Sequence, residues 1–184
     1  MAQINAQHSQ SGQDLTMQSE RKTVLIVCYS DTGHTRDATE ALDKALDATV
    51  EYLRAPLLDG HHGFWMFCWR ALGAMFGRSV DIDPPQHDPA GFDLVVLATP
   101  IWAGRASTPI RAYLESFHRR FHNVAFVTTQ SGASTGRALT DLASLTGQQP
   151  VATLSLSDAD RHDYQDARKL ADFAETLIRA VPEE

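Results

Sequence analysis

The chain has 184 residues, a formal net charge of −7 and two cysteines, with 43% hydrophobic and 21% charged residues. This length fits one domain with a sizeable core, and the composition is ordinary for a globular protein. The negative charge argues against a general nucleic-acid-binding protein, which needs excess cations to neutralise phosphates. No apolar run approaches the ~18 residues of a membrane-spanning helix. Because neither cysteine has metal-ligand or disulfide-framework spacing, we expect a reducing, cytoplasmic setting.

The first 21 residues are polar, rich in Gln and Ser, and show no hydrophobic periodicity. Such a segment cannot bury enough apolar surface to offset the entropy of ordering it. We therefore expect a disordered tail over residues 1–21, with Met1 or Met17 as the native start, and a folded domain over residues 22–184.

From residue 22 onward, two kinds of apolar pattern alternate along the chain. Short runs rich in β-branched residues are typical of parallel strands covered on both faces, and they lie at 23–29, 49–54, 94–99, 123–129 and 150–156. Segments with one apolar helical face lie at 38–46, 64–76, 108–117, 136–147 and from about 163 to 181. Five strands alternating with five helices predict an α/β domain around a parallel sheet.

Small and hydroxyl-bearing residues follow the first, third and fourth predicted strands. Doubly wound α/β folds bind ligands outside the carboxyl ends of their strands. We therefore expect SDTGHT (30–35), TPIWAGRAS (99–107) and TTQSGAS (128–134) to meet at that edge. None of the three carries a charge cluster typical of catalysis, so we expect neither a catalytic side chain nor a metal site there.

The turn after the first strand does not match the common phosphate-binding motifs. A cysteine phosphatase loop needs Cys and Arg separated by five residues, but Arg36 lies eight positions after Cys28, and His34 stands where the arginine should be. The lysine of a Walker loop and the G-x-G-x-x-G turn of dinucleotide-binding domains are also missing.

Hydroxyl groups at Ser30, Thr32 and Thr35 surround Gly33 where the next helix is expected to start. The unpaired N–H groups of a helix start can hold a phosphate without lysine or arginine. The alternative is that Ser30 or Thr32 only caps the helix.

SDTGHT resembles the S/T-x-T-G-x-T phosphate loop of the flavodoxin family, and TPIWAG (99–104) and TTQSGAS are similar to its second and third FMN loops. The resemblance covers residues 22–181. It implies a flavodoxin-like, doubly wound three-layer sandwich with a five-stranded parallel sheet in the order 2-1-3-4-5 and FMN at the carboxyl edge. The FMN-binding residues that it implies are Ser30, Asp31, Thr32, Gly33, His34, Thr35, Pro100, Ile101, Trp102, Ala103, Gly104, Thr129, Gln130, Ser131, Gly132 and Ala133.

The resemblance also implies a role for each loop. Amides and hydroxyls of the first loop would bind the phosphate of FMN, with His34 and Arg36 beside it at the surface. Trp102 in the second loop would lie next to the isoalloxazine ring, unless it only packs its own loop. The third loop would support the other side of the ring.

Two functions fit an FMN domain of this kind. Carrier flavodoxins usually place an aromatic residue in the third loop, and TTQSGAST (128–135) has none, which would leave one face of the flavin open to a nicotinamide unless Tyr164 covers it. This favours an oxidoreductase that moves hydride from NAD(P)H to a quinone or another small acceptor. The alternatives are a single-electron carrier serving a redox protein partner, and a cofactor-free interaction module on the same fold.

Residues 64–76 would form a helix that is apolar nearly all round, with Trp65 and Trp69 off its inward stripe. Such a helix is covered on both sides or forms an interface. We expect a homodimer contact or a lid over the flavin edge, and the alternative is a thick core helix.

Overall fold

The structure is a computed structural model that describes residues 22–56, 58, 80–131, 135–162 and 165–180. Several predictions lie outside these ranges. They are the tail over 1–21, the helix over 64–76 with its homodimer or lid, and the positions of Gly132, Ala133 and Tyr164.

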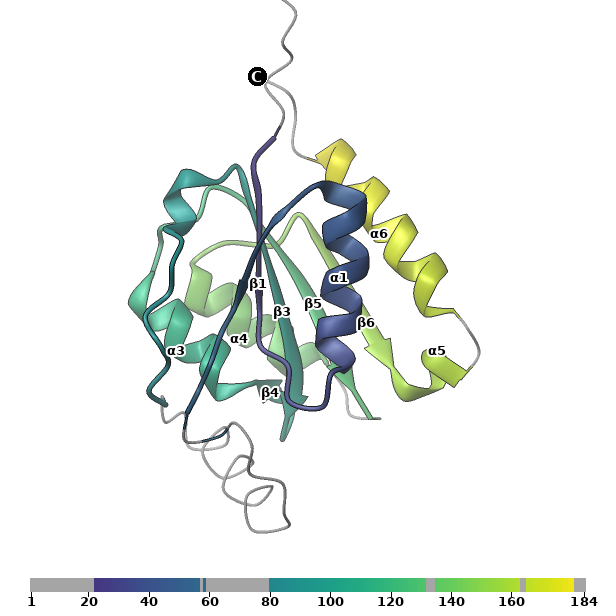
Figure 1. The fold of residues 1–184 in the computed structure, drawn as a ribbon, viewed down its shortest axis with the longest axis horizontal. Helices are drawn as coiled ribbons and strands as arrows, with labels where there is room; N and C mark the ends of the chain where they lie inside the picture. Colours follow the sequence, from purple (N-terminus) through teal and green to yellow (C-terminus); the bar gives the residue numbers. More distant parts are fainter. Residues whose placement is uncertain (1–21, 57, 59–79, 132–134, 163–164, 181–184) are drawn as a thin grey trace, which may run out of the picture.

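A parallel sheet with the strand order β2-β1-β3-β5-β6 forms the centre of the molecule (Figure 1). Its strands are β1 (Val24–Cys28), β2 (Thr49–Tyr52), β3 (Leu94–Trp102), β5 (Val124–Gln130) and β6 (Ala152–Ser157). A short strand, β4 (Arg105–Ala106), pairs antiparallel with the end of β3. The predicted order 2-1-3-4-5 is confirmed once β4 is left out of the numbering. The sequence did not predict β4, because two residues are too few to show a period.

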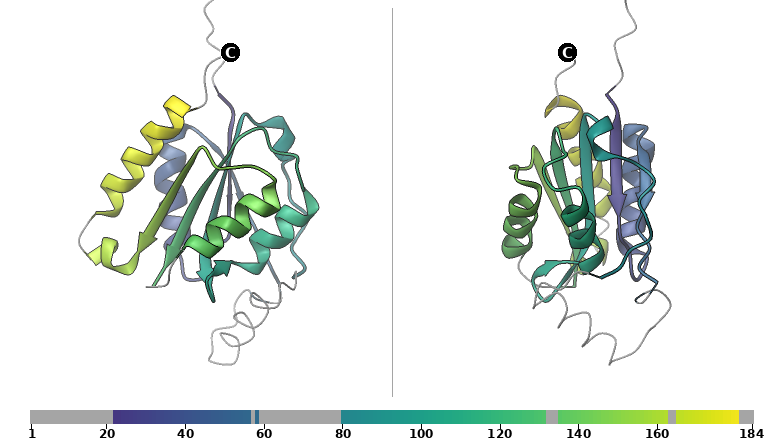
Figure 2. Two further views of the ribbon diagram at one scale, coloured as in Figure 1. Left: turned by 180° about the vertical axis from the view of Figure 1, so that it is seen from behind. Right: turned by 90° about the vertical axis from the view of Figure 1, so that its left-hand side faces the viewer.

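Helices cover both faces of this sheet and complete the three predicted layers (Figure 2). Helices α1 (His34–Leu46) and α6 (Asp166–Ala180) pack on one face, and α3 (Thr108–Ser116) and α4 (Gly136–Thr146) pack on the other. A 3₁₀ turn, η1 (Pro89–Gly91), precedes β3, and α5 (Asp158–His162) follows β6. Among the helices in the described ranges, none combines the length and the apolar character that a bilayer crossing requires.

The alternation of side chains along β1 explains why the sheet needs both helical layers. Val24, Ile26 and Cys28 are buried in the cluster shared with α1 and α6. Leu25 and Val27 are buried in the cluster shared with α3 and α4. Because neighbouring side chains point to opposite faces of a strand, a fully apolar run requires cover on both sides.

The end of the chain differs from its prediction. The long helix expected from about residue 163 is α6, which begins at Asp166, and the separate helix α5 precedes it. Two apolar residues of this helix, Ala171 and Ile178, are exposed, whereas Phe173 is buried. The buried set of α6 is Leu170, Phe173, Ala174 and Leu177, a narrower stripe at i, i+3, i+4 and i+7.

Candidate functional site

The first loop, residues 30–35, opens α1 with free main-chain donors. Gly33 is the N-cap residue with φ 95°, and no side chain caps the helix at that position. Ser30 Oγ accepts a hydrogen bond from the amide of Arg36 at 3.2 Å. Ser30 therefore satisfies one main-chain donor in the first turn of α1, although it is not the N-cap residue. Within the part of the chain that the structure describes, the amides of His34 and Thr35 have no acceptor. The loop can therefore offer two N–H groups and the positive end of a helix dipole to an anion.

A buried pair of hydroxyl groups connects the first loop with the third. Thr35 Oγ1 and Thr129 Oγ1 lie 2.8 Å apart, and both residues are buried. Thr35 stands in the first turn of α1, and Thr129 lies near the end of β5. The contact supports the prediction that the loops after β1 and β5 meet at the carboxyl edge.

The second loop is a tight hairpin between β3 and β4. Trp102 pairs with Arg105 across the turn. Ala103 and Gly104 form the turn itself, with φ values of 49° and 76°. Positive φ at both central residues is the mark of a type I′ hairpin, whose twist matches that of its strands.

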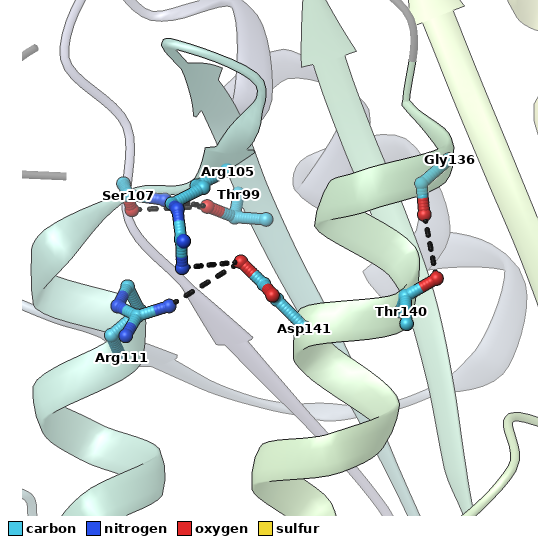
Figure 3. Close-up of polar contacts among 7 residues, drawn as sticks. All are labelled: Thr99, Arg105, Ser107, Arg111, Gly136, Thr140 and Asp141. Atoms are coloured by element: carbon cyan, nitrogen blue, oxygen red, sulfur yellow. Dashed lines mark hydrogen bonds and ion pairs between the residues drawn. The ribbon is translucent and has the colours of Figure 1, made fainter. Parts of the chain in front are cut away.

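Two buried polar side chains fix the base of this hairpin (Figure 3). Thr99 Oγ1 lies 3.0 Å from Ser107 Oγ and accepts a hydrogen bond from the amide of Ser107, also at 3.0 Å. Both residues are fully buried. These bonds join the two arms of the loop, so Pro100 to Gly104 project from a fixed base.

An aromatic contact connects the second loop with the first. The rings of Trp102 and Tyr29 meet edge to face with centroids 5.6 Å apart. Tyr29 is buried directly before the first loop, whereas Trp102 is only partly buried. Edge-to-face pairs of this kind stabilise by about 0.5–1.5 kcal/mol beyond the area that they bury. Trp102 therefore has a supported position with part of its surface accessible.

The third loop begins with Thr129, Gln130 and Ser131, after which residues 132–134 lie outside the described ranges. Gln130 Oε1 is buried and has no hydrogen-bond partner among the described residues. A buried acceptor without a donor lowers the stability of the fold by about 1–3 kcal/mol. This carbonyl oxygen could accept a hydrogen bond from a ligand N–H.

A charge cluster that the sequence analysis did not expect lies beside the second loop (Figure 3). Asp141 Oδ2 accepts a hydrogen bond from Arg105 Nη1 at 3.0 Å and lies 3.6 Å from Arg111 Nη1. Arg105 belongs to the segment that we expected to carry no such cluster. Arg111 and Asp141 come from α3 and α4, and the sequence gives no local sign that the three residues converge.

Cys28, which raised the possibility of a phosphatase, lies in the core. Its side chain is fully buried, and burial raises the pKa of the thiol to about 11. The thiol therefore stays protonated at neutral pH and is a poor nucleophile. In the described ranges, no group of three or more His, Cys, Asp or Glu side chains could hold a metal ion.

No protein-family model and no curated protein matches this sequence. Solved structures do resemble it. A flavoprotein from Lactobacillus acidophilus in complex with FMN has a TM-score of 0.65 at 20% identity, over 78% of this chain and 99% of that one.

Two further structures share the architecture at lower similarity. A flavodoxin, WrbA-like protein from Agrobacterium tumefaciens has a TM-score of 0.52 at 16% identity, over 88% of this chain and 99% of that one. The two-electron reduced flavodoxin of Megasphaera elsdenii has a TM-score of 0.52 at 13% identity, over 83% and 98%. The chain therefore has the flavodoxin-like fold.

Proposed function

We propose that this chain binds FMN at the carboxyl edge of its sheet and works as a redox protein. The observation that carries the proposal is the meeting of the three loops, through the Thr35–Thr129 hydroxyl pair and the Tyr29–Trp102 ring contact. Structures of the same fold include a flavoprotein in complex with FMN and a flavodoxin. Fold alone does not fix function, so the proposal depends on whether the residues of this edge suit FMN.

The polar groups of the edge suit the two ends of that cofactor. The unpaired amides of His34 and Thr35 suit its phosphate, because a helix start favours an anion. The buried Oε1 of Gln130 suits a ligand with an N–H donor, which the pyrimidine part of the flavin provides. The residues proposed to bind FMN remain those of the sequence prediction, Ser30 to Thr35, Pro100 to Gly104 and Thr129 to Ala133.

Bound FMN would supply the group that accepts and passes on electrons or hydride. The protein binds and orients it, and tunes its electronics through nearby charges and hydrogen bonds. In this assignment, the first loop holds the phosphate, Trp102 lies beside the ring system, and the third loop supports the other side.

Within this function, we favour an oxidoreductase that takes hydride from NAD(P)H and reduces a quinone or another small acceptor. The sequence of the third loop supports this choice, because TTQSGAST offers no ring to cover a flavin face. An uncovered face is what a nicotinamide needs in order to stack against the flavin. The second candidate is a one-electron carrier that serves a protein partner.

Anaerobic reduction of the FMN-loaded protein separates these candidates. The oxidoreductase predicts that NADPH or NADH bleaches the flavin absorbance within seconds, much faster than it reduces free FMN at the same concentration. A carrier would be bleached by dithionite but not by either nicotinamide. If the protein binds FMN but the bound flavin reacts with neither NADPH nor NADH, the oxidoreductase proposal is overturned and FMN binding is left in place.

A further inference from the structure

Arg105, Arg111 and Asp141 come together from three separate elements beside the second loop (Figure 3). Arg105 belongs to β4, Arg111 to α3 and Asp141 to α4. Both guanidinium groups face the same carboxylate oxygen, at 3.0 Å from Arg105 and 3.6 Å from Arg111. We call Arg105 and Arg111 the arginine pair.

The arginine pair carries more charge than its partner can balance. Two guanidinium groups against one carboxylate leave a net charge of +1, and among the described residues no other carboxylate is paired with either arginine. The surroundings screen this charge weakly, because Arg111 is only 8% exposed and the Arg105 side chain 20%. Nε of both arginines is buried without an acceptor in the described part of the chain. A partly desolvated cation is thus maintained in a protein of net charge −7.

The hairpin places this charge next to the loop that is proposed to flank the flavin. Arg105 follows Gly104 directly and pairs with Trp102 across the turn. Residues directly opposite in an antiparallel pair share a face and have neighbouring Cβ atoms. The arginine pair therefore lies at the base of the loop that would flank the ring system, and α4, which carries Asp141, follows the third loop.

We propose that the arginine pair stabilises the negative charge of reduced FMN and so raises the reduction potential of the cofactor. Transfer of one hydride from a nicotinamide to FMN moves two electrons and one proton, so the flavin gains one negative charge while the nicotinamide becomes the oxidised cation. A fixed positive charge nearby favours the more negative state. The inference rests on the proposed FMN site and concerns two residues with no assigned role.

Charge variants at this cluster should move the potential in opposite directions. Arg111→Gln lowers the net charge of the cluster to zero, and Asp141→Asn raises it to +2. We expect each to change the ratio of affinities for reduced and oxidised FMN about tenfold, the size expected for one charge across several ångströms of protein. For a two-electron couple, a tenfold change is about 30 mV, downward for Arg111→Gln and upward for Asp141→Asn.

Two further variants test whether the shifts in potential come from charge and not from a change in the structure. The double variant Arg111→Gln/Asp141→Asn restores the net charge of +1 and should return the potential toward that of the wild type. Arg120→Gln is the matched control, because it removes an arginine from an exposed ion pair with Asp88. It should leave the potential unchanged. If Asp141→Asn does not fold, Arg105→Gln takes its place, with the downward shift expected for Arg111→Gln.

The measurement is the equilibrium potential of bound FMN against reference dyes, together with the dissociation constants for both redox states. Opposite shifts in the two single variants, with recovery in the double variant, support the proposal. A shift in the same direction in Arg111→Gln and Asp141→Asn, an upward or absent shift in Arg105→Gln where that variant is used, or shifts no larger than that of Arg120→Gln would overturn it and leave FMN binding intact. Failure of the wild type to bind FMN would instead overturn the proposed function, and this inference with it.

Discussion

At the amino edge of the sheet, where β1 and β3 begin, polar groups bond to one another, whereas at the carboxyl edge several have no partner. Asp93 shows the first condition. Its carboxylate accepts hydrogen bonds from the amide and the hydroxyl of Thr23, at 2.8 and 2.9 Å, and its own amide donates to Thr23 O. Its carbonyl accepts a further bond from Asn123 Nδ2 at 3.0 Å.

The carboxyl edge contains hydrogen-bond donors and acceptors that no described residue of the protein satisfies. Among the described residues, the amides of His34 and Thr35, Gln130 Oε1 and Nε of the arginine pair are without partners. Stability alone would favour pairing Gln130 Oε1 and the two Nε groups, because an unpaired buried polar group costs about 1–3 kcal/mol. The difference teaches that the amino edge is built for stability and the carboxyl edge for a ligand.

The largest effect that we expect comes from Gly33→Val at the carboxyl edge. Gly33 has φ 95°, a conformation that a β-branched residue rarely adopts, although a Cβ there would meet no atom within 4 Å. The strain should cost about 3 kcal/mol of unfolding free energy, or the loop should change conformation. Either result should weaken FMN binding at least tenfold, as measured by thermal unfolding and by titration.

Gly91→Val is the matched control for that prediction. Gly91 also has open space around its Cβ position, but it has no positive φ and lies at the amino edge. It should change FMN affinity by less than twofold. Equal losses of affinity in both variants would contradict the distinction between the two edges.

The next largest effect should come from Thr35→Val, which breaks the hydroxyl pair with Thr129. The remaining hydroxyl would be buried without a partner, at a cost of about 2 kcal/mol in unfolding free energy. Replacing both threonines by valine should cost less than the single change, because no orphaned polar group remains. Denaturant unfolding of the two variants measures this order, and a double variant that is less stable than the single one would disprove it.

The smallest effect should come from Asp93→Asn at the amino edge. Hydrogen bonds from the amide and then the hydroxyl of Thr23 lower the pKa of Asp93. Its ionised form therefore stabilises the fold above the ordinary carboxyl pKa, and this stabilisation is lost as the pH falls through the lowered value. At pH 7, we expect a loss of less than about 1 kcal/mol, because water screens this exposed carboxylate, with unchanged FMN affinity.

The pH dependence provides the check on that last prediction. The stability difference between wild type and Asp93→Asn should shrink as the pH falls from the ordinary carboxyl pKa through the lowered pKa of Asp93, because the wild-type carboxyl group becomes neutral as well. A constant difference from pH 7 to pH 2 would show that the charge of Asp93 does not cause the effect.

The sequence predicted the sheet and the loop positions because both depend on local patterns. A run such as VLIVC (Val24–Cys28) requires burial on both faces, and a parallel sheet collects the residues after its strands at one edge. The sequence also carries a local signal for α5. Ser157 and Asp160 form a capping box, in which Ser157 Oγ accepts from the amide of Asp160 while Asp160 Oδ2 accepts from the amide of Ser157.

Contacts between distant residues could not be predicted in this way. Arg105 and Asp141 are 36 positions apart, and the sequence between them carries no pattern that brings these side chains together. The same holds for Thr35 and Thr129, which are 94 positions apart. Their side chains meet only because the strand order and the packing of the helices bring their elements side by side.

A titration of the purified protein with FMN and, separately, with riboflavin tests the central claim most directly. Riboflavin has the same ring system but lacks the phosphate for which the start of α1 is proposed. We predict saturable binding of one FMN per chain, with riboflavin bound about 100-fold more weakly, a difference of about 2.7 kcal/mol. Equal affinities would contradict the phosphate role of residues 30–35, and no binding of either flavin would favour a cofactor-free interaction module.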